Sequence, residues 1–304
     1  MQTLNISIYV LALLILLALL FDFMNGFHDA ANAIATVVST GVLKPSSAVA
    51  LAAFFNFVAI AVFQLKVATT VGKGTIDPSV VDHYVVFGAL VGAIIWNIVT
   101  WFFGIPSSSS HALIGGLVGA GLAKAGPSAL VASGVIKTIV FILVSPLLGF
   151  ILGALLTLLF SWLCFRMSPA YVDRWFRRFQ LLSASLYSLG HGGNDAQKTM
   201  GIITLALVIG GLHEGDSIPA WVKVAAAVTI SLGTYAGGWR IMKTLGHKMI
   251  EVDQVKGLAS TTVASTVLYV MAIHFKAPIS TTHTITSSIL GAGATRGRKW
   301  VRWG

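Results

Sequence analysis

Charged side chains are scarce in this sequence: they account for 10% of its 304 residues, whereas hydrophobic residues account for 56%. A soluble domain carries about 25% charged residues, so this composition excludes an ordinary soluble fold. Apolar runs of about 20 residues, long enough to cross the hydrocarbon core of a bilayer as helices, recur along the whole chain. The sequence therefore predicts an all-α membrane protein that crosses the lipid bilayer several times.

Cysteine and acidic residues are also few. The single cysteine, Cys164, excludes a disulfide framework and a cysteine-based metal site. The 20 basic residues outnumber the 10 acidic ones, but they lie in short loops between apolar runs, as topology signals do. We therefore expect no nucleic-acid partner. The first apolar run, Ile6 to Phe21, has no basic start and no small-residue cleavage site, which favours a mature helix over a signal peptide.

Two polar motifs occur twice in the chain, in the same order. The segment Asn25–Asn32 (NGFHDAAN) resembles His191–Lys198 (HGGNDAQK), and Pro106–His111 (PSSSSH) resembles Pro278–His283 (PISTTH). Chance similarity between apolar helices is common, but two polar motifs in matching order indicate a duplication.

We divide the chain accordingly into a first repeat (residues 1–163), a basic cytoplasmic linker (164–178) and a second repeat (179–304). Each repeat is expected to contain a helical hairpin, at 83–124 and 258–293, whose tip turns back inside the membrane. Each repeat then crosses the bilayer an odd number of times, so the second is an inverted copy of the first. In this register the second repeat is expected to lack the counterpart of the long last helix of the first.

The basic residues are distributed unevenly between the two sides that this topology defines. By the positive-inside rule, the side richer in Lys and Arg is cytoplasmic, which places the N-terminus outside. The richer side holds Lys44, Arg166, Arg174, Arg177, Arg178, Arg240, Lys243, Lys248, Lys256, Arg296, Arg298, Lys299 and Arg302, and the other side holds Lys66, Lys73, Lys124 and Lys223. This asymmetry supports the inverted repeat.

Two aspartates, Asp29 and Asp195, occupy equivalent positions in the middle of apolar segments. Ionisable groups at membrane depth are costly and are functional by default. Each aspartate could cap a half-helix, but Asn32 and Asn194 lie alongside, and the pair favours binding or relay of a coupling ion or proton. Neighbouring glycines are expected to unwind the helices there and to free backbone carbonyls for a cation; they are Gly26, Gly190, Gly192 and Gly193.

Runs of hydroxyl side chains follow the prolines of the second motif and precede a helix. Proline ends the preceding element, and Ser or Thr caps the helix that begins there, so each run marks a helix N-terminus that can bind an anion. Capping needs one hydroxyl, and the runs supply more: Ser107, Ser108, Ser109, Ser110, Ser280, Thr281 and Thr282. We expect them to bind a small tetrahedral oxyanion; the alternative is that they join helix to helix.

The remaining polar residues of the motifs are four histidines and one lysine. His28, His111, His191 and His283 are candidate proton relays, or satisfied buried side chains. Lys198 stands where the first repeat has Asn32, so its ammonium could occupy a cation site or compensate the charge of an anionic substrate. No metal site is assigned, and no resident cofactor is expected.

These motifs (GFHDAANA, GGNDAQK, PSSSSH and PISTTH) resemble the signatures of the inorganic phosphate transporter (PiT) family over about residues 20–300. The resemblance implies a bacterial inner-membrane homodimer with two re-entrant hairpins around a central phosphate, and a coupling cation. It implies that Ser107 to Ser110 and Ser280 to Thr282 contact phosphate. Asp29, Asn32, Asn194 and Asp195 would bind or relay the coupling ion.

The dipeptide Gln197-Lys198 resembles the low-affinity bacterial branch of this family, which is similar in using protons and accepting metal-phosphate complexes. We therefore expect a symporter that imports phosphate by alternating access, with protons favoured over sodium. The alternatives are a sodium-coupled phosphate symporter, a sulfate permease of the same fold and a passive anion channel. An intramembrane enzyme is not favoured, because serine chemistry needs one nucleophile with an aligned base, whereas these hydroxyls form duplicated runs.

Overall fold

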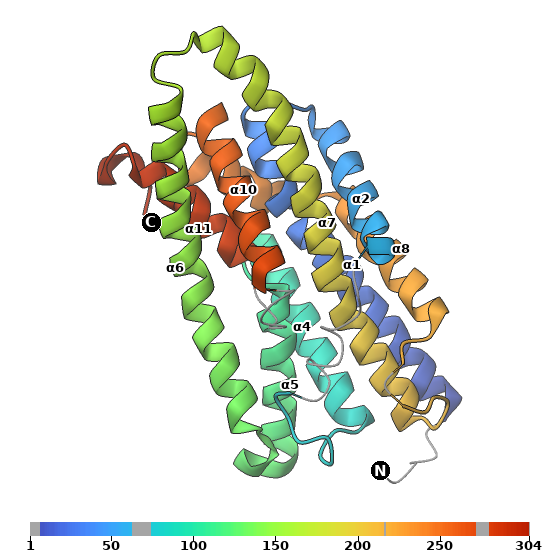
Figure 1. The fold of residues 1–304 in the computed structure, drawn as a ribbon. Coiled ribbons are helices and arrows are strands. Elements are labelled where there is room, and N and C mark those ends of the chain that lie inside the picture. Colours follow the sequence, from blue (N-terminus) through green and yellow to red (C-terminus); the bar gives the residue numbers. More distant parts are fainter. Residues whose placement is uncertain (1–6, 63–73, 216, 272–279, 304) are drawn as a thin grey trace.

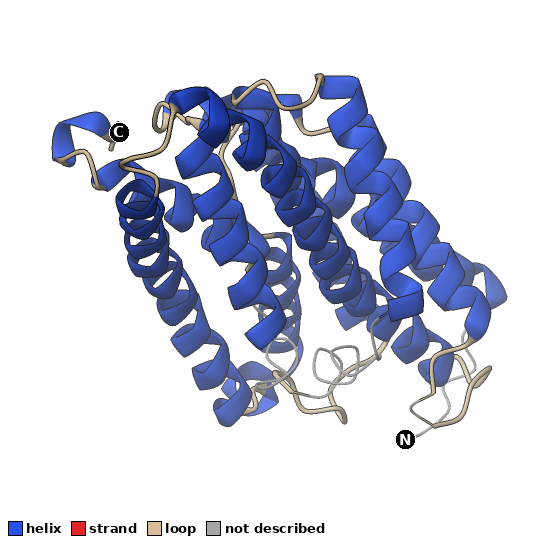
Figure 2. Ribbon diagram, turned by 45° about the horizontal axis from the view of Figure 1, so that its top comes forward, coloured by secondary structure: helices blue, strands red, loops and turns tan. Residues whose placement is uncertain are grey.

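The computed structural model describes residues 7–62, 74–215, 217–271 and 280–303, and over these residues it is helical, without a β-sheet (Figures 1 and 2). The expectation of an all-α protein is confirmed. The helices are α1 (Ile8–Ser39), α2 (Pro45–Val62), α4 (His83–Phe103), α5 (Ser109–Ala125), α6 (Ala132–Leu163), α7 (Pro169–Ile209), α8 (Ala220–Ala236), α9 (Trp239–Lys243), α10 (Gln254–Val270) and α11 (Thr281–Ala294).

Four of these helices, α1, α2, α4 and α6, are long and apolar enough to cross a membrane. Helix α6 has the least buried surface of the four, and large apolar side chains such as Ile136, Leu143 and Leu155 are exposed along its length. Because apolar side chains in water would be unfavourable, we infer that this face of α6 lies against lipid.

Helix α7 has 41 residues and is therefore about 60 Å long, twice the thickness of the hydrocarbon core. Its first turns include much of the segment 164–178, which the sequence predicted as a linker; from Pro169 onward that segment is helix. Arg177 there pairs with Asp173 and donates to the carbonyl of Gly41 at the end of α1.

The predicted hairpin at 83–124 is formed by α4 and α5. Asp82 begins α4 by accepting hydrogen bonds from two backbone N–H groups, and Gly104, with a φ of 67°, ends it. In Figure 1 this hairpin lies in one half of the molecule and the pair α10–α11 lies in the other. The residues Pro278 and Ile279 in the predicted second hairpin, and the predicted loop residues Lys66 and Lys73, lie outside the described residues.

Helices α1 and α7 run unbroken through Asp29 and Asp195, so the predicted unwinding of these helices was wrong. The glycines serve close packing instead. A Cβ atom on Gly26 would lie 2.1 Å from the carbonyl oxygen of Ile230 in α8, and one on Gly192 would lie 2.5 Å from the carbonyl oxygen of Asn56 in α2. Glycine therefore lets α1 and α7 approach their neighbours without losing helical hydrogen bonds.

The connections between the helices separate into two groups at opposite ends of the bundle. Figure 1 places the α1–α2 and α6–α7 connections at one end, and the α5–α6 and α7–α8 connections at the other. This matches the two sides that the basic residues define in the sequence. The inverted relation between the two repeats, and the assignment of the cytoplasmic side, stay predictions.

Candidate functional site

The centre of the site is a pair of aspartates on neighbouring helices, Asp29 on α1 and Asp195 on α7. His191 lies between them: its Nε2 atom is 3.2 Å from Asp195 Oδ2 and 3.7 Å from Asp29 Oδ2. All three side chains are at most 2% exposed. The first polar motif of each repeat thus meets its counterpart at one buried point, as a duplicated binding site requires.

The start of α11 contacts this carboxylate pair. Thr282 Oγ1 donates to Asp29 Oδ1 at 3.1 Å and accepts from Asn32 Nδ2 at 2.9 Å. The hydroxyl of Thr281 lies 3.4 Å from Asp29 Oδ2 and 3.5 Å from Asp195 Oδ2. Two of the hydroxyls predicted to bind an anion, those of Thr281 and Thr282, are therefore hydrogen-bonded to the carboxylates in this structure.

The start of α5 reaches the same pair from the other hairpin through Lys198. The ammonium of Lys198 donates to Asp195 Oδ1 and to Ser110 Oγ. Asn194 also donates to Asp195 Oδ1, at 2.9 Å. Ser109 is fully buried, and its hydroxyl has no hydrogen-bond partner among the described residues. At this tip the Ser109 hydroxyl is therefore unused, and the Ser110 hydroxyl accepts a hydrogen bond from Lys198 of the second repeat.

The two helix starts are capped in the same way. Ser108 Oγ accepts from the backbone N–H of His111 at 3.2 Å, and Ser280 Oγ accepts from that of His283 at 2.9 Å. The rings of His111 and His283 lie 5.1 Å apart between their centroids. The N-termini of α5 and α11 thus approach one point with their positive dipole ends, which is the arrangement that binds anions.

An open cavity of about 590 Å³ leads to these helix starts. It is lined by Trp96, Ser107, Ser108, His111 and His283, together with small residues of α4 and α5. Trp96 Nε1 donates to Ser107 Oγ at 2.9 Å. The cavity provides space for a small anion beside the tips, and Ser107 lies at its wall rather than at the carboxylate pair.

The four predicted histidines fall into two groups. His28 and His191 contact the aspartates: His28 Nδ1 is 3.0 Å from Asp29 Oδ1, and its Nε2 is 3.1 Å from Thr100 Oγ1. His111 and His283 line the cavity instead. A proton can pass between an imidazole and a carboxylate at these distances, so the first group is better placed for a relay.

Asp29, His191 and Asp195 could also hold a cation, because one ligand atom from each lies within 4.8 Å of the other two. Carboxylate oxygens and an imidazole nitrogen are common metal ligands. The ammonium of Lys198 already contacts Asp195 and so competes with a metal ion for that carboxylate. The ligand set therefore fits a transient cation better than a resident one.

Several residues of the site have no counterpart in the predicted set. Tyr187, fully buried one turn before His191, donates its hydroxyl to the carbonyl of Thr281 at 3.2 Å. Asn56 Oδ1 lies 3.3 Å from His191 Nδ1. The helical period places Tyr187 on the same face as His191, so the sequence could have predicted it. Asn56 is a lone amide in an apolar segment, and nothing else in the sequence indicates that it belongs to the site.

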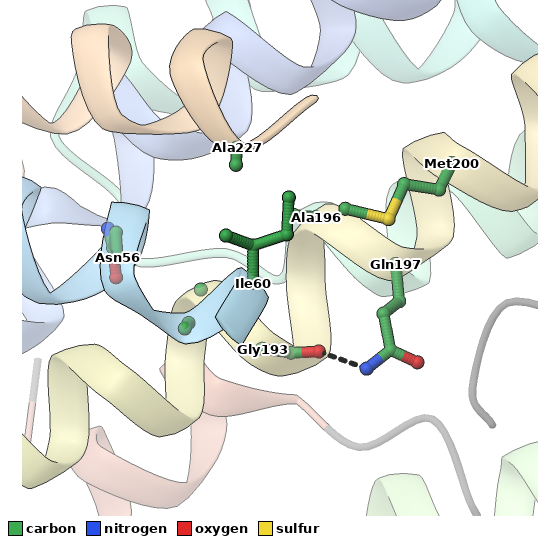
Figure 3. Close-up of a pocket in the computed structure, with 9 residues that line it drawn as sticks. Asn56, Ile60, Gly193, Ala196, Gln197, Met200 and Ala227 are labelled. Carbon is green, nitrogen blue, oxygen red and sulfur yellow. Dashed lines mark hydrogen bonds between the residues drawn. The ribbon is translucent and has the colours of Figure 1, made fainter. Parts of the chain in front are cut away.

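The side chain of Gln197, next to Lys198, lies in different surroundings. Its Nε2 donates to the carbonyl oxygen of Gly193 at 2.6 Å, and its side chain lines a narrow pocket with Asn56, Ile60 and Met200 (Figure 3). Of the dipeptide that suggested proton coupling, Lys198 is the residue that contacts the aspartate pair.

Comparison with known proteins identifies the family. The profile of the Phosphate transporter family matches residues 25–304. The chain belongs to this family. The predicted resemblance is thereby confirmed, and the apolar helices agree with a multi-pass protein of the plasma membrane.

Relatives in other bacteria are similar over nearly the whole chain. A probable low-affinity inorganic phosphate transporter of Rhizobium meliloti (strain 1021) is 56% identical over 96% of this chain and 87% of its own length. A protein of the same description from Bacillus subtilis (strain 168) is 45% identical over 99% of this chain and 90% of its own length. These relatives are named as transporters and not as enzymes.

The fold also matches a solved structure, described as the sodium-dependent phosphate transporter. The TM-score is 0.85, and the match covers 95% of this chain and 90% of the other at 22% sequence identity. At this identity the match establishes the shared fold, and the coupling ion in its description applies to that protein.

Proposed function

We propose that the chain is a symporter that imports inorganic phosphate, driven by protons, through alternating access around the site between α1, α7 and the starts of α5 and α11. One observation carries the proposal: three of the groups that could bind the anion, on Thr281, Thr282 and Lys198, are bonded to Asp29 and Asp195. The descriptions of the relatives as low-affinity inorganic phosphate transporters support the substrate.

The hydrogen bonds of the site supply a physical basis for coupling. While Asp29 and Asp195 are ionised, they hold Thr281, Thr282 and Lys198, and they repel an anion. Protonation of a carboxylate removes the repulsion and weakens its hydrogen bonds with these donors. The donors can then form hydrogen bonds with a phosphate. By linkage, bound phosphate favours the protonated site to the same extent, so proton and phosphate move together.

Lys198 favours protons over sodium as the coupling ion. Its ammonium contacts Asp195 Oδ1, where a sodium ion would otherwise bind, and a fixed positive charge lowers the affinity for a second cation. In the sodium-coupled alternative, a sodium ion would have to bind the other oxygens of Asp29 and Asp195 while Lys198 keeps its contact with Asp195 Oδ1.

The carboxylates also provide a basis for choosing phosphate over sulfate. Phosphate at neutral pH still carries a proton that it can donate to whichever of Asp29 and Asp195 remains ionised while the other is protonated, whereas sulfate has none. Phosphate that arrives as a complex with a divalent metal would bring the cation to Asp29, His191 and Asp195. The homodimer and the outside location of the N-terminus are further parts of the proposal that come from the family resemblance and the basic loops.

Phosphate uptake into proteoliposomes tests the proposal. An inward proton gradient is expected to drive accumulation of labelled phosphate without sodium, and excess sulfate is expected to compete weakly. Accumulation that requires sodium would favour the sodium-coupled alternative, and strong competition would favour the sulfate permease. Equilibration without accumulation would indicate a passive channel, and uptake equal to that of empty liposomes would contradict a transport function.

A further inference from the structure

A third buried carboxylate, Asp22, lies on α1 outside the site described above. Its side chain is 0% exposed. Thr199 on α7 donates a hydrogen bond to Asp22 Oδ1 at 2.8 Å, and Asp22 Oδ2 has no hydrogen-bond partner among the described residues. Asp22 has no assigned role in the phosphate site described above.

The surroundings of Asp22 are unfavourable for a permanent charge. The adjacent turns of α1 and α7 contribute Ala18, Phe21, Met200 and Ile203 to the largest apolar cluster of the described structure. An ionised carboxylate in such an interior needs hydrogen bonds on both oxygens or a counter-ion, and Asp22 has one hydrogen bond, from a neutral hydroxyl. A proton on Oδ2 would remove the charge.

Asp22 is aligned with the central carboxylates on both helices. On α1 it is two turns before Asp29, and Asn25 lies on the same face between them. Asn25 is buried, and its Oδ1 atom has no hydrogen-bond partner among the described residues. On α7 its partner Thr199 is one turn after Asp195, on the same face. Polar side chains, which we call the polar stripe, therefore lie between Asp22 and the aspartate pair along the α1–α7 interface.

The charged groups around Asp22 come mainly from α7. Asp195 and His191 act on it electrostatically, and Lys198 precedes its partner Thr199. Helix α2, which packs on α7, carries no ionisable residue. On α4 and α8, which pack on α1, the basic residues are His83 and Lys223, each in the first turn of its helix, and the other titratable residues are Tyr84 and Tyr235. Asp22 is thus an acidic group with no direct cationic partner in the described structure.

We propose that Asp22 binds the coupling proton before the proton reaches Asp195 and Asp29. The proposal rests on the proposed proton-coupled function and assigns the proton to a residue outside the phosphate site. A proton from water on the side of the α1 N-terminus adds to Oδ2 and forms one O–H bond. That bond breaks when the proton passes along the polar stripe, and the proton is finally released to water on the opposite side.

The test compares two activities of purified protein in proteoliposomes. One is accumulation of labelled phosphate driven by an inward proton gradient, and the other is exchange of labelled for unlabelled phosphate at equal pH on both sides. For Asp22→Asn we expect proton-driven accumulation to fall at least tenfold and exchange to stay within threefold of wild type. Asp22→Glu, which keeps the carboxylate, is expected to recover most of the accumulation.

Two further variants complete the experiment. Thr199→Val removes the hydroxyl that contacts Asp22 at nearly constant volume, and is expected to slow accumulation more than exchange. Asp173→Asn alters a carboxylate at the exposed start of α7, 48% exposed, and is expected to leave both activities unchanged.

The proposal is overturned if Asp22→Asn accumulates phosphate as wild type does with the same pH dependence. It is also overturned if folded Asp22→Asn, judged by gel filtration and melting temperature, loses exchange and accumulation equally, because that marks a structural role. If Asp22→Asn does not fold, the accumulation-to-exchange ratio of Thr199→Val decides, and a wild-type ratio in that variant overturns the proposal. If wild-type accumulation requires sodium and Asp22→Asn loses that requirement, the proposal is overturned and Asp22 belongs to a sodium site instead. Failure of wild-type protein to transport phosphate under any gradient would contradict the proposed function itself.

Discussion

The ammonium of Lys198 contacts the carboxylate of Asp195 one turn away on the same helix, and the same ammonium reaches Ser110 on the hairpin of the first repeat. A salt bridge between two buried groups leaves a costly charge behind when one partner is removed. We therefore expect the cation that neutralises Asp195 to determine which ion the transporter needs.

Replacement of Lys198 by asparagine, the residue at the matching position of the first repeat, should change this ion. Without the ammonium, Asp195 needs another cation, and we expect proton-driven phosphate uptake to fall at least tenfold and to become stimulated by sodium. Uptake into proteoliposomes with and without sodium measures the effect. Lys198→Arg keeps the charge and serves as the control. Sodium-independent uptake at the wild-type rate in Lys198→Asn would contradict the role given to Lys198.

Thr282 is expected to be a phosphate ligand of the second hairpin. Its hydroxyl donates to Asp29 and accepts from Asn32 in the structure, and we expect it to turn to phosphate when Asp29 is protonated. A hydrogen bond to a charged group contributes about 1.5–3 kcal/mol, so Thr282→Val should raise the KM for phosphate at least tenfold.

The matched control for Thr282→Val is Thr286→Val, four residues along the same helix. The hydroxyl of Thr286 is buried and has no hydrogen-bond partner among the described residues, so its loss should change the KM less than twofold. Equal KM values for the two variants would remove Thr282 from the site.

The packing of α1 on α8 predicts a large effect for a small substitution. A methyl group at Gly26 would meet the carbonyl oxygen of Ile230 at 2.1 Å, and a backbone atom cannot rotate away. We expect Gly26→Ala to destabilise the protein by about 2 kcal/mol and to lower its melting temperature in detergent. Gly119→Ala on α5, where nothing lies within 4 Å of the new Cβ atom, should leave the melting temperature unchanged or slightly higher. Equal melting temperatures would show that α1 and α8 can separate without cost.

The loop before α4 contains a pH-dependent contact outside the membrane-spanning segments. Asp82 caps α4 by accepting from the N–H groups of Tyr84 and Val85, and Lys124 lies 2.7 Å from its Oδ2. Burial acts to raise the pKa of Asp82, but the hydrogen bonds from Lys124 and Val85 outweigh it and lower the pKa below the usual 3.8.

A carboxylate with a lowered pKa stabilises the folded state above its unfolded pKa, and this contribution is lost as the pH falls through the folded value. Asp82→Ala should therefore destabilise the protein by about 1 kcal/mol at pH 7, and the difference from wild type should shrink below about pH 4. Asp82→Asn, whose amide oxygen can still cap the helix, should lose less. Melting temperatures between pH 3 and 8 measure the effect, and a constant difference over this range would exclude a role for the carboxylate charge.

The duplicated polar motifs predicted which residues meet at the site. The residues that come together in the structure are Asp29, Asp195, Thr281, Thr282, Ser110 and Lys198. The motifs were informative about them because a duplicated polar motif inside an apolar segment has few other structural uses. The glycines were ambiguous, because the same absence of a side chain permits both unwinding and close helix packing. The carbonyl groups of the neighbouring helices, which lie close to the glycines in the structure, distinguish close packing from unwinding.

Asp22 could not be found from the repeat, because the corresponding position in the second half is Ser188 and no paired motif draws attention to it. The spacing of seven residues to Asp29 does put both on one face of α1, but in the sequence a charged residue directly after the apolar run Ile6–Phe21 is just as compatible with a site at the membrane surface. Its burial and its hydrogen bond with Thr199 depend on how α7 packs on α1 in the folded bundle. This packing joins segments far apart in the sequence and could not be predicted from the local pattern.

The choice between phosphate and sulfate should depend on the aspartate pair. A hydrogen-bonding site rejects a ligand that leaves its buried acceptor unpaired by a large factor, and sulfate cannot donate to an ionised Asp29 or Asp195. In Asp29→Asn and Asp195→Asn, the amide can rotate to donate to either oxyanion. We therefore expect these variants to bind phosphate more weakly and to lose at least tenfold of their preference over sulfate.

Inhibition of labelled phosphate exchange by sulfate at equal pH measures this preference independently of the driving ion. Ser107→Ala, which alters the cavity wall next to Trp96 rather than the aspartate pair, is the control and should keep the wild-type ratio of phosphate to sulfate. If both aspartate variants kept the full preference for phosphate, selectivity would have to come from the hydroxyls and helix N-termini. A hydroxyl oxygen can also accept the hydrogen bond that phosphate donates and sulfate cannot, so such a result would assign the discrimination to the hydroxyl groups instead of the carboxylates.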